Sequence, residues 1–209
     1  IEQYLRRTLD DNFALFEAHP DYVFSFEGSF RYRLMAEYYP ERFERLHDYV
    51  RAGRWRVAGS WVDAVDTNIP SPESLIRHVL YGNDYFRDTF GMTSRDVFLP
   101  DCFGFGYALP TVAAHCGLLG FSTQKLTWGS AVGIPFDIGL WQGLDGSVLV
   151  SALNPGAYVA DLERDQSRDS VWVARARGLE ACCDLPVAYR YFGTGDTGGA
   201  GNQCHCGPE

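Results

Sequence analysis

The sequence lacks long apolar runs and clusters of basic residues. No stretch of its 209 residues approaches the 18 consecutive apolar residues of a membrane-spanning helix. Lys and Arg total 18 against 27 Asp and Glu, so the formal net charge is −9, and the basic residues are scattered. Such a charge distribution repels phosphate backbones and anionic lipids. We therefore expect neither nucleic acid nor a membrane as a partner, and the oligomeric state stays open.

The cysteines are few and do not have the even spacing of a secreted disulfide framework. The six are Cys102, Cys116, Cys182, Cys183, Cys204 and Cys206. Reduced thiols are the better interpretation, which favours a cytoplasmic location. However, helical spacing begins at once after Ile1, so we expect the start of the domain, and any targeting segment, to precede this chain. The compartment therefore remains unknown.

The residues that are present can build one sizeable core, since 46% are hydrophobic. Patterns typical of strands cover residues 22–26, 55–61, 96–99, 119–123, 139–141, 148–153 and 187–192. Helical spacing covers residues 5–16, 34–39, 40–50, 71–80, 109–116 and 170–182. This alternation predicts parallel strands joined by right-handed crossovers, and hence an α/β fold.

Polar residues follow the apolar run of nearly every predicted strand. They are Glu27, Asp63, Asp66, Asp101, Gln124, Lys125, Asn154 and Asp196. The carboxyl ends of parallel strands meet on one face, where active sites of α/β proteins are built. Turns are polar in any case, so a single such residue carries little weight. Their recurrence on one side of the strands predicts a site at that face.

The most informative segment is FLPDCFGFGYALP, residues 98–110. A predicted strand ends at Pro100 and Asp101 and opens into a glycine-rich turn before a helix. Backbone can approach a ligand closely there, while the Asp101 carboxylate points into the cleft. The alternative is that Asp101 caps a turn and that Phe103 and Phe105 belong to the core. Spacing alone leaves both open.

This segment resembles the nucleophile motif of glycoside hydrolase family 38, the α-mannosidases. Further blocks are similar to that family in the same order: GSWVDAVDTNIPSPESLIRH (59–78), FSTQKLTW (121–128), LWQGLDGS (140–147) and YFGTGDTGG (191–199). We assign residues 1–199 to a partial catalytic domain of this family. Residues 200–209, with Cys204-His205-Cys206, form a tail that does not resemble it.

The resemblance implies an irregular β/α barrel of about seven parallel strands, incomplete here at both ends. It also implies a zinc-dependent, retaining α-mannosidase that hydrolyses terminal α-mannosides of oligosaccharides or glycoconjugates by double displacement. Asp101 matches the nucleophile, which in this family also binds the zinc.

Two further residues match positions beside the nucleophile. Phe103 falls where the family has an aromatic residue, and Lys125 where a cation approaches the nucleophile; a nearby positive charge favours the ionised form of a carboxylate. Asp196 is the candidate acid/base. The alternatives are core packing for Phe103, a solvated strand end for Lys125 and an ordinary turn in Gly-Asp-Thr-Gly for Asp196.

A separate block supplies candidate contacts to substrate hydroxyl groups. Trp61, Asp63 and Asp66 lie where other members of the family often carry an acid after the tryptophan. Trp61 also fits packing inside the barrel, the commoner position of a Trp beside a strand. Substrate binding is therefore predicted for all three, with packing open for Trp61.

The sequence departs from the family at the metal. The resemblance implies a zinc held by a His-x-Asp pair, the nucleophile and a distant histidine, but no His-x-Asp occurs here. Of the histidines, His47, His78 and His115 lie in predicted helices. Asp101 is then one ligand of four, and we expect this chain alone to bind zinc weakly and to hydrolyse little or nothing.

Two alternative functions remain open. One is a non-catalytic carbohydrate-binding or degenerate barrel that kept the cleft and lost the metal. The other is a metal-dependent enzyme similar to polysaccharide deacetylases, which needs an Asp and two His around its metal. No such histidine pair is visible in the sequence.

Overall fold

The computed structural model describes residues 2–129, 133–161, 165–196 and 198–200. Its strands are β1 (Phe24–Glu27), β2 (Trp55–Ala58), β3 (Asp96–Phe98), β4 (Gly120–Ser122), β5 (Ile138–Gln142) and β6 (Val148–Ala152). Its α-helices are α1 (Glu2–Ala18), α2 (Ser29–Tyr38), α3 (Pro40–Arg51), α4 (Pro72–Phe90), α5 (Leu109–His115) and α6 (Ser170–Cys183). Two single turns of 3₁₀-helix are η1 (Lys125–Thr127) and η2 (Gln166–Arg168). The Cys-His-Cys sequence lies outside the described residues.

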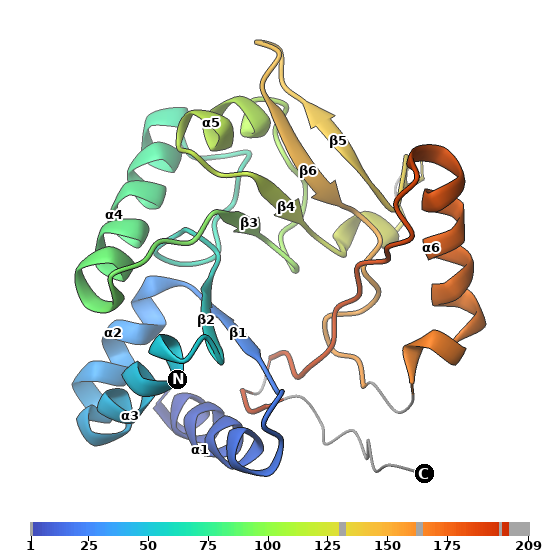
Figure 1. Cartoon of the computed structure of the whole chain (residues 1–209). Coiled ribbons are helices and arrows are strands. Elements are labelled where there is room, and N and C mark those ends of the chain that lie inside the picture. Colours follow the sequence, from blue (N-terminus) through green and yellow to red (C-terminus); the bar gives the residue numbers. More distant parts are fainter. Residues whose placement is uncertain (1, 130–132, 162–164, 197, 201–209) are drawn as a thin grey trace.

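The strands form two sheets. β1 and β2 pair in parallel, and a second sheet has the order β3-β4-β6-β5, with only β5 antiparallel. The Ser60 amide donates to the Asp96 carbonyl at 3.1 Å, which joins the end of β2 to the start of β3. In Figure 1 the helices lie outside the strands. The α/β expectation is confirmed, whereas no closed sheet is formed by the described residues.

The helix boundaries follow local sequence signals. Before α4, the Ser71 hydroxyl accepts a hydrogen bond from the Ser74 amide at 3.2 Å, and Pro72 occupies the first helical position. The helix ends at Gly91, whose φ of 71° is a left-handed conformation that glycine adopts without strain. Pro40 likewise begins α3. These starts are the ones predicted from the sequence.

Two cores hold the elements together. An aromatic-rich core between α1–α4 and β1–β2 includes Phe13, Phe16, Tyr32, Trp55 and Phe86. A mainly aliphatic core between α4, α5 and the larger sheet includes Val79, Val97, Leu99, Leu109 and Leu149. Full burial of each such side chain stabilises the fold by about 1.5–3 kcal/mol. Because α4 contributes to both cores, it fixes the two sheets relative to each other.

One predicted strand is wrong. Residues 187–192 are irregular, and their backbone bonds to a neighbouring irregular segment: the Tyr191 amide donates to the Pro155 carbonyl at 2.7 Å. Only a single bridge, between Ala160 and Gly193, connects these segments as in a sheet. Both edges of the preceding strand β6 are already occupied, by β4 and β5, so this segment has no free edge of β6 to pair with.

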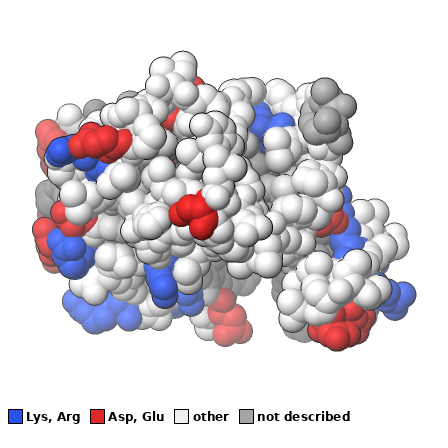
Figure 2. All heavy atoms as spheres, turned by 90° about the horizontal axis from the view of Figure 1, so that it is seen from above, with Lys and Arg blue, Asp and Glu red and all other residues white. Residues whose placement is uncertain are grey.

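The described surface shows no large patch of one charge on the face drawn in Figure 2. Acidic and basic side chains are interspersed there, and much of the face carries neither. Within the described residues, no helix combines the length and apolarity that a membrane span requires.

Candidate functional site

A cavity of about 780 Å³ opens at the carboxyl ends of β1, β2 and β3. This volume lies within the range of small-molecule sites. Its lining includes charged and phenolic groups that are far apart in the sequence: Glu27, Arg31, Asp63, Asp101, Tyr158 and Asp196. The prediction that polar residues after the strands meet on one face therefore holds for Glu27, Asp63 and Asp101, and Asp196 joins them from a loop that follows no strand.

Asp101 is held by a buried lysine. It follows β3 closely, and Lys125 begins the 3₁₀ turn η1 after the adjacent parallel strand β4. The Lys125 Nζ lies 2.5 Å from Asp101 Oδ1, and the lysine side chain is only 4% exposed. A buried ammonium requires a partner, and a carboxylate supplies both charge and a hydrogen-bond acceptor. The pair therefore fixes one oxygen of the candidate nucleophile, and half of its side chain stays accessible from the cavity.

Aromatic rings surround the same ammonium group. Lys125 Nζ lies 3.4 Å from the ring centroid of Trp128, 4.9 Å from that of Phe103 and 5.6 Å from that of Tyr158. Ring faces attract cations, most strongly where water is excluded. The Phe103 ring itself is 73% exposed, so it is not a core residue. The structure thus places Phe103 and Lys125 beside Asp101, as expected.

Asp196 reaches the cavity from a loop. It has a left-handed φ of 64°, which aspartate tolerates better than most residues. Burial, then the charges of Asp101 and Asp196, and then hydrogen bonds with both carboxylates raise the pKa of Tyr158. The two candidate catalytic carboxylates therefore interact with a single phenol, although 95 positions separate them in the sequence (196 − 101).

An acidic cluster lies at the β1 end of the cavity. The Arg31 guanidinium bridges two carboxylates, at 3.3 Å from Glu27 and 2.8 Å from Asp63. Burial raises the pKa of Glu27 to about 7, against the attraction of Arg31 and with the help of the charges on Asp63 and Asp96. Glu27 is thus a carboxyl group that titrates near neutral pH.

Trp61 and Asp66 do not line the cavity. Trp61 is 1% exposed and belongs to the aliphatic core, with its ring 6.0 Å from that of His78. This placement supports the packing alternative raised for it. Asp66 accepts hydrogen bonds from the amides of Asn68 and Ile69, at 2.7 and 3.2 Å, so its carboxylate shapes a turn.

The turn after Asp66 supports the glycine-rich loop that follows Asp101. The Thr67 hydroxyl donates to the Gly104 carbonyl at 3.3 Å, and the Asn68 side-chain amide donates to the Phe103 carbonyl at 3.5 Å. A Cβ on Gly104 would lie 2.9 Å from that same Asn68 nitrogen. The glycine therefore permits close approach of the two loops, and the turn that Asp66 shapes contacts the loop after Asp101.

The described residues do not fit a zinc ion. Zinc needs about four protein or water ligands of nitrogen, oxygen or sulfur. Among the residues that the structure describes, no group of three or more His, Cys, Asp or Glu side chains could hold a metal ion. As expected, His47, His78 and His115 lie in helices α3, α4 and α5, and His115 pairs with Asp145 at 3.1 Å. Asp101 remains a single candidate ligand.

Sequence reasoning missed Tyr158, Trp128 and Arg31. Tyr158 follows Asn154, which was noted at a strand end, but Asn154 itself bonds to Asp137 at 2.8 Å and does not line the cavity. The Tyr158 amide instead donates to Gln124 at 2.6 Å, another residue noted at a strand end. Trp128 closes the quoted block FSTQKLTW, so its position in a family block was an available signal.

Comparisons with known proteins identify the family of this chain. A family model described as "Glycosyl hydrolases family 38 N-terminal domain" matches residues 1–206, which extends past the boundary we drew at Gly199. The chain is 32% identical over 194 residues to alpha-mannosidase G of Dictyostelium discoideum, covering 92% of this chain and 17% of that protein. It thus spans about a sixth of the length of this relative.

Solved structures show the same fold. An alpha-mannosidase from Enterococcus faecalis superposes with a TM-score of 0.70 at 17% identity, over 97% of this chain and 23% of that one. A putative polysaccharide deacetylase from Mycobacterium smegmatis has a TM-score of 0.57 at 14% identity, over 90% of this chain and 64% of that one. The fold is therefore shared across different enzymes, and it is the sequence match that selects among them. The chain belongs to family 38 of the glycosyl hydrolases.

Proposed function

We propose that the protein containing this chain is a retaining α-mannosidase that removes terminal α-mannosyl residues from oligosaccharides or glycoconjugates. One observation carries the proposal: Asp101 and Asp196 interact with the same phenol, Tyr158, inside one cavity. Retaining glycosidases need two carboxyl groups on either side of the scissile bond. The curated relative named alpha-mannosidase G supports the choice of sugar.

Asp101 is the proposed nucleophile. Its carboxylate forms a bond to the anomeric carbon as the bond from that carbon to the leaving oxygen breaks. Asp196 donates its proton to the leaving oxygen and becomes the carboxylate. In the second step Asp196 takes a proton from water, the hydroxyl oxygen attacks the anomeric carbon, and the Asp101 carboxylate departs. The sugar keeps its configuration because it is inverted twice.

Lys125 and Tyr158 hold the two carboxyl groups. Lys125 fixes Asp101 Oδ1 at 2.5 Å, which leaves the second oxygen for attack. Tyr158 has one phenolic proton, so it donates to one carboxylate at a time. We propose that it serves whichever of Asp101 and Asp196 carries the charge at each stage.

Sugar contacts are proposed for the exposed groups beside the nucleophile. The Phe103 and Trp128 rings lie edge to face, 6.4 Å apart, and offer apolar surface to the carbon-bound hydrogens of a sugar ring. Asp63 lines the same cavity and can accept hydrogen bonds from sugar hydroxyls. Trp61 stays outside this set because it is 1% exposed, and Asp66 because its carboxylate accepts hydrogen bonds from the amides of Asn68 and Ile69.

The proposed catalytic domain is a zinc-dependent barrel of which this chain forms a part. We place residues 1–199 in a β/α barrel to which the two sheets contribute, and the family resemblance implies zinc in that domain. The described residues supply Asp101 as one candidate zinc ligand, and no step above depends on the metal.

The test is the substrate preference and stereochemistry of the full-length protein. We expect release of 4-nitrophenol from its α-mannoside in preference to its β-mannoside and α-glucoside. Proton NMR during hydrolysis of the α-mannoside should show α-mannose as the first product, before mutarotation. Formation of β-mannose first would contradict the retaining mechanism. Inactivity on α-mannosides with release of acetate from an acetylated polysaccharide would favour the deacetylase alternative.

A further inference from the structure

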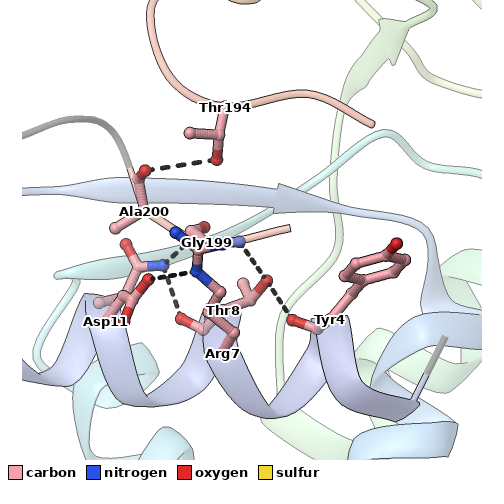
Figure 3. A network of polar contacts seen from close by, with 8 residues as sticks. Tyr4, Arg7, Thr8, Asp11, Thr194, Gly199 and Ala200 are labelled. Carbon is pink, nitrogen blue, oxygen red and sulfur yellow. Dashed lines mark hydrogen bonds and ion pairs between the residues drawn. The ribbon is translucent and has the colours of Figure 1, made fainter. Parts of the chain in front are cut away.

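The loop that carries Asp196 rests on the first helix of the chain. Figure 3 shows Gly199 and Ala200 lying over the early turns of α1, with Thr8 directed toward Gly199. The Gly199 amide donates to the Thr8 hydroxyl at 2.9 Å across 191 positions of sequence. Asp196 lies three residues before Gly199, so at most about 11 Å of chain separates this contact from the candidate acid/base.

The hydrogen bonding and burial of Thr8 favour this contact. Its hydroxyl donates to the Tyr4 carbonyl at 2.9 Å within α1, which leaves the oxygen lone pairs for the Gly199 amide. The threonine is 2% exposed, and Gly199 is buried as well. A buried amide that loses its acceptor is unfavourable, so this hydrogen bond favours the observed position of the loop.

Asn12, one turn further along α1, adds a second contact. Its side-chain amide donates to the Thr8 carbonyl at 2.7 Å and to the Gly199 carbonyl at 3.4 Å. Its oxygen accepts from the Tyr22 hydroxyl at 3.0 Å, and the residue is fully buried. Both backbone groups of Gly199 are thus bound by side chains of one rigid helix.

Two glycines allow the loop to lie this close. A Cβ on Gly198 would lie 2.8 Å from the Tyr4 carbonyl oxygen, and Gly198 has a left-handed φ of 64°. A Cβ on Gly199 would lie 3.3 Å from the Asp11 carboxylate. The Thr194 hydroxyl donates to the Ala200 carbonyl at 3.3 Å, which links residues before and after Asp196. The loop therefore packs closely against α1 in one defined position.

We propose that Thr8 is a positioning residue for the acid/base: it holds the Asp196 loop in register with Asp101 through Gly199. The inference rests on the proposed function, in which Asp196 protonates the leaving oxygen. Loss of this anchor displaces Asp196 while Asp101 keeps its own support from β3 and Lys125. The defect is then confined to steps that need the acid.

The leaving group separates this role from a general loss of structure. A mannoside of a poor leaving group, such as 4-methoxyphenol, needs protonation in the first step, whereas 2,4-dinitrophenol departs without it. The value of kcat/KM reports that first step. A positioning residue for the acid therefore affects the first substrate and spares the second, and a residue needed only for folding lowers both by the same factor.

The experiment compares Thr8→Val in the full-length protein with wild type on both substrates. We expect kcat/KM for the 4-methoxyphenyl α-mannoside to fall about 10- to 100-fold, with less than about a twofold change for the 2,4-dinitrophenyl α-mannoside. Thr8→Ser, which keeps the hydroxyl, should restore the wild-type ratio. Thr93→Val, on an exposed threonine between α4 and β3, is the matched control and should leave the ratio unchanged.

The variant Asp196→Ala distinguishes failure of this inference from failure of the proposed function. If Asp196→Ala discriminates between the two leaving groups but Thr8→Val does not, the positioning role is overturned. If Asp196→Ala does not discriminate, Asp196 is not the acid and the proposed function fails first. Should Thr8→Val fail to fold, Gly198→Ala, which pushes the loop off Tyr4, decides by the same criterion.

Discussion

The two candidate catalytic carboxylates are held in different ways. Asp101 follows a parallel strand, and its partner Lys125 follows the neighbouring strand, so the sheet itself sets their separation. Asp196 lies in a loop without strand neighbours, and side chains of α1 and the Tyr158 segment hold it. The half of the site that contains Asp101 is thus fixed by sheet register, and the half that contains Asp196 is fixed by tertiary contacts alone. The second half should therefore be the easier one to displace.

The largest effect is expected at the strand-borne carboxylate. Asp101→Asn keeps the size of the side chain but removes the nucleophile, and kcat for an aryl α-mannoside should fall by at least about 10³-fold. Because both leaving groups need the nucleophile, the loss should be similar for the 4-methoxyphenyl and 2,4-dinitrophenyl substrates. Retention of more than a tenth of the wild-type rate would remove Asp101 from the mechanism.

A smaller and more selective effect is expected at the loop. Asp196→Ala should lower kcat/KM about 10²- to 10⁴-fold for the poor leaving group and much less for 2,4-dinitrophenol. Azide, which needs no general base, should restore turnover of the dinitrophenyl substrate and yield α-mannosyl azide. Detection of the azide product by mass spectrometry is the readout. Without that product, another residue has to be the acid/base.

Replacement of Lys125 tests whether this residue, which follows β4, supports Asp101 alone. Lys125→Met keeps the length of the side chain but removes the charge that fixes Asp101 Oδ1, so kcat/KM should fall about 10- to 100-fold. The loss should be equal for the two leaving groups, in contrast to Asp196→Ala. Lys125→Arg is the charge-retaining control and should lose less. A loss restricted to the poor leaving group would show that Lys125 acts on the acid/base step, and it would contradict this division of the site into two halves.

The smallest effect concerns stability on the strand-borne side. Burial raises the pKa of Glu27 from 4.5 to about 7, so the folded state binds more protons than the unfolded state between these values. The contribution of Glu27 to stability is thus present below pH 4.5 and is lost as the pH rises through 7. Glu27→Gln removes this loss, and the variant should exceed wild type by about 3 kcal/mol at pH 8.

Urea denaturation at pH 4.5 and pH 8 measures this difference. The two proteins should have similar free energies of unfolding at the lower pH, because Glu27 is then largely protonated in the folded state. Asp21→Asn, on an exposed residue before β1, serves as a control that should show no such pH-dependent gain. A constant difference between Glu27→Gln and wild type would show that Glu27 does not titrate near neutral pH.

The sequence predicted what local pattern determines. The alternation of elements and the start of α4 at Ser71-Pro72 follow from short-range signals, whereas the proximity of Lys125 to Asp101 was implied by the family resemblance. Residues 187–192 have an apolar pattern but do not pair with β6, because β4 and β5 already occupy both edges of that strand. Thr8 and Gly199 lie 191 positions apart, so no window of sequence relates them. Such contacts are set by the packing of α1 against the loop.

The most direct test of the account is the identity of the residue that bonds to the sugar. The full-length protein is incubated with a 2-deoxy-2-fluoro mannosyl fluoride, whose glycosyl-enzyme hydrolyses slowly, and is then digested and sequenced by mass spectrometry. The account predicts a fluoromannosyl adduct on Asp101, absent from Asp101→Asn and still formed in Thr8→Val. An adduct on Asp196, or on any residue outside the 98–110 segment, would contradict it.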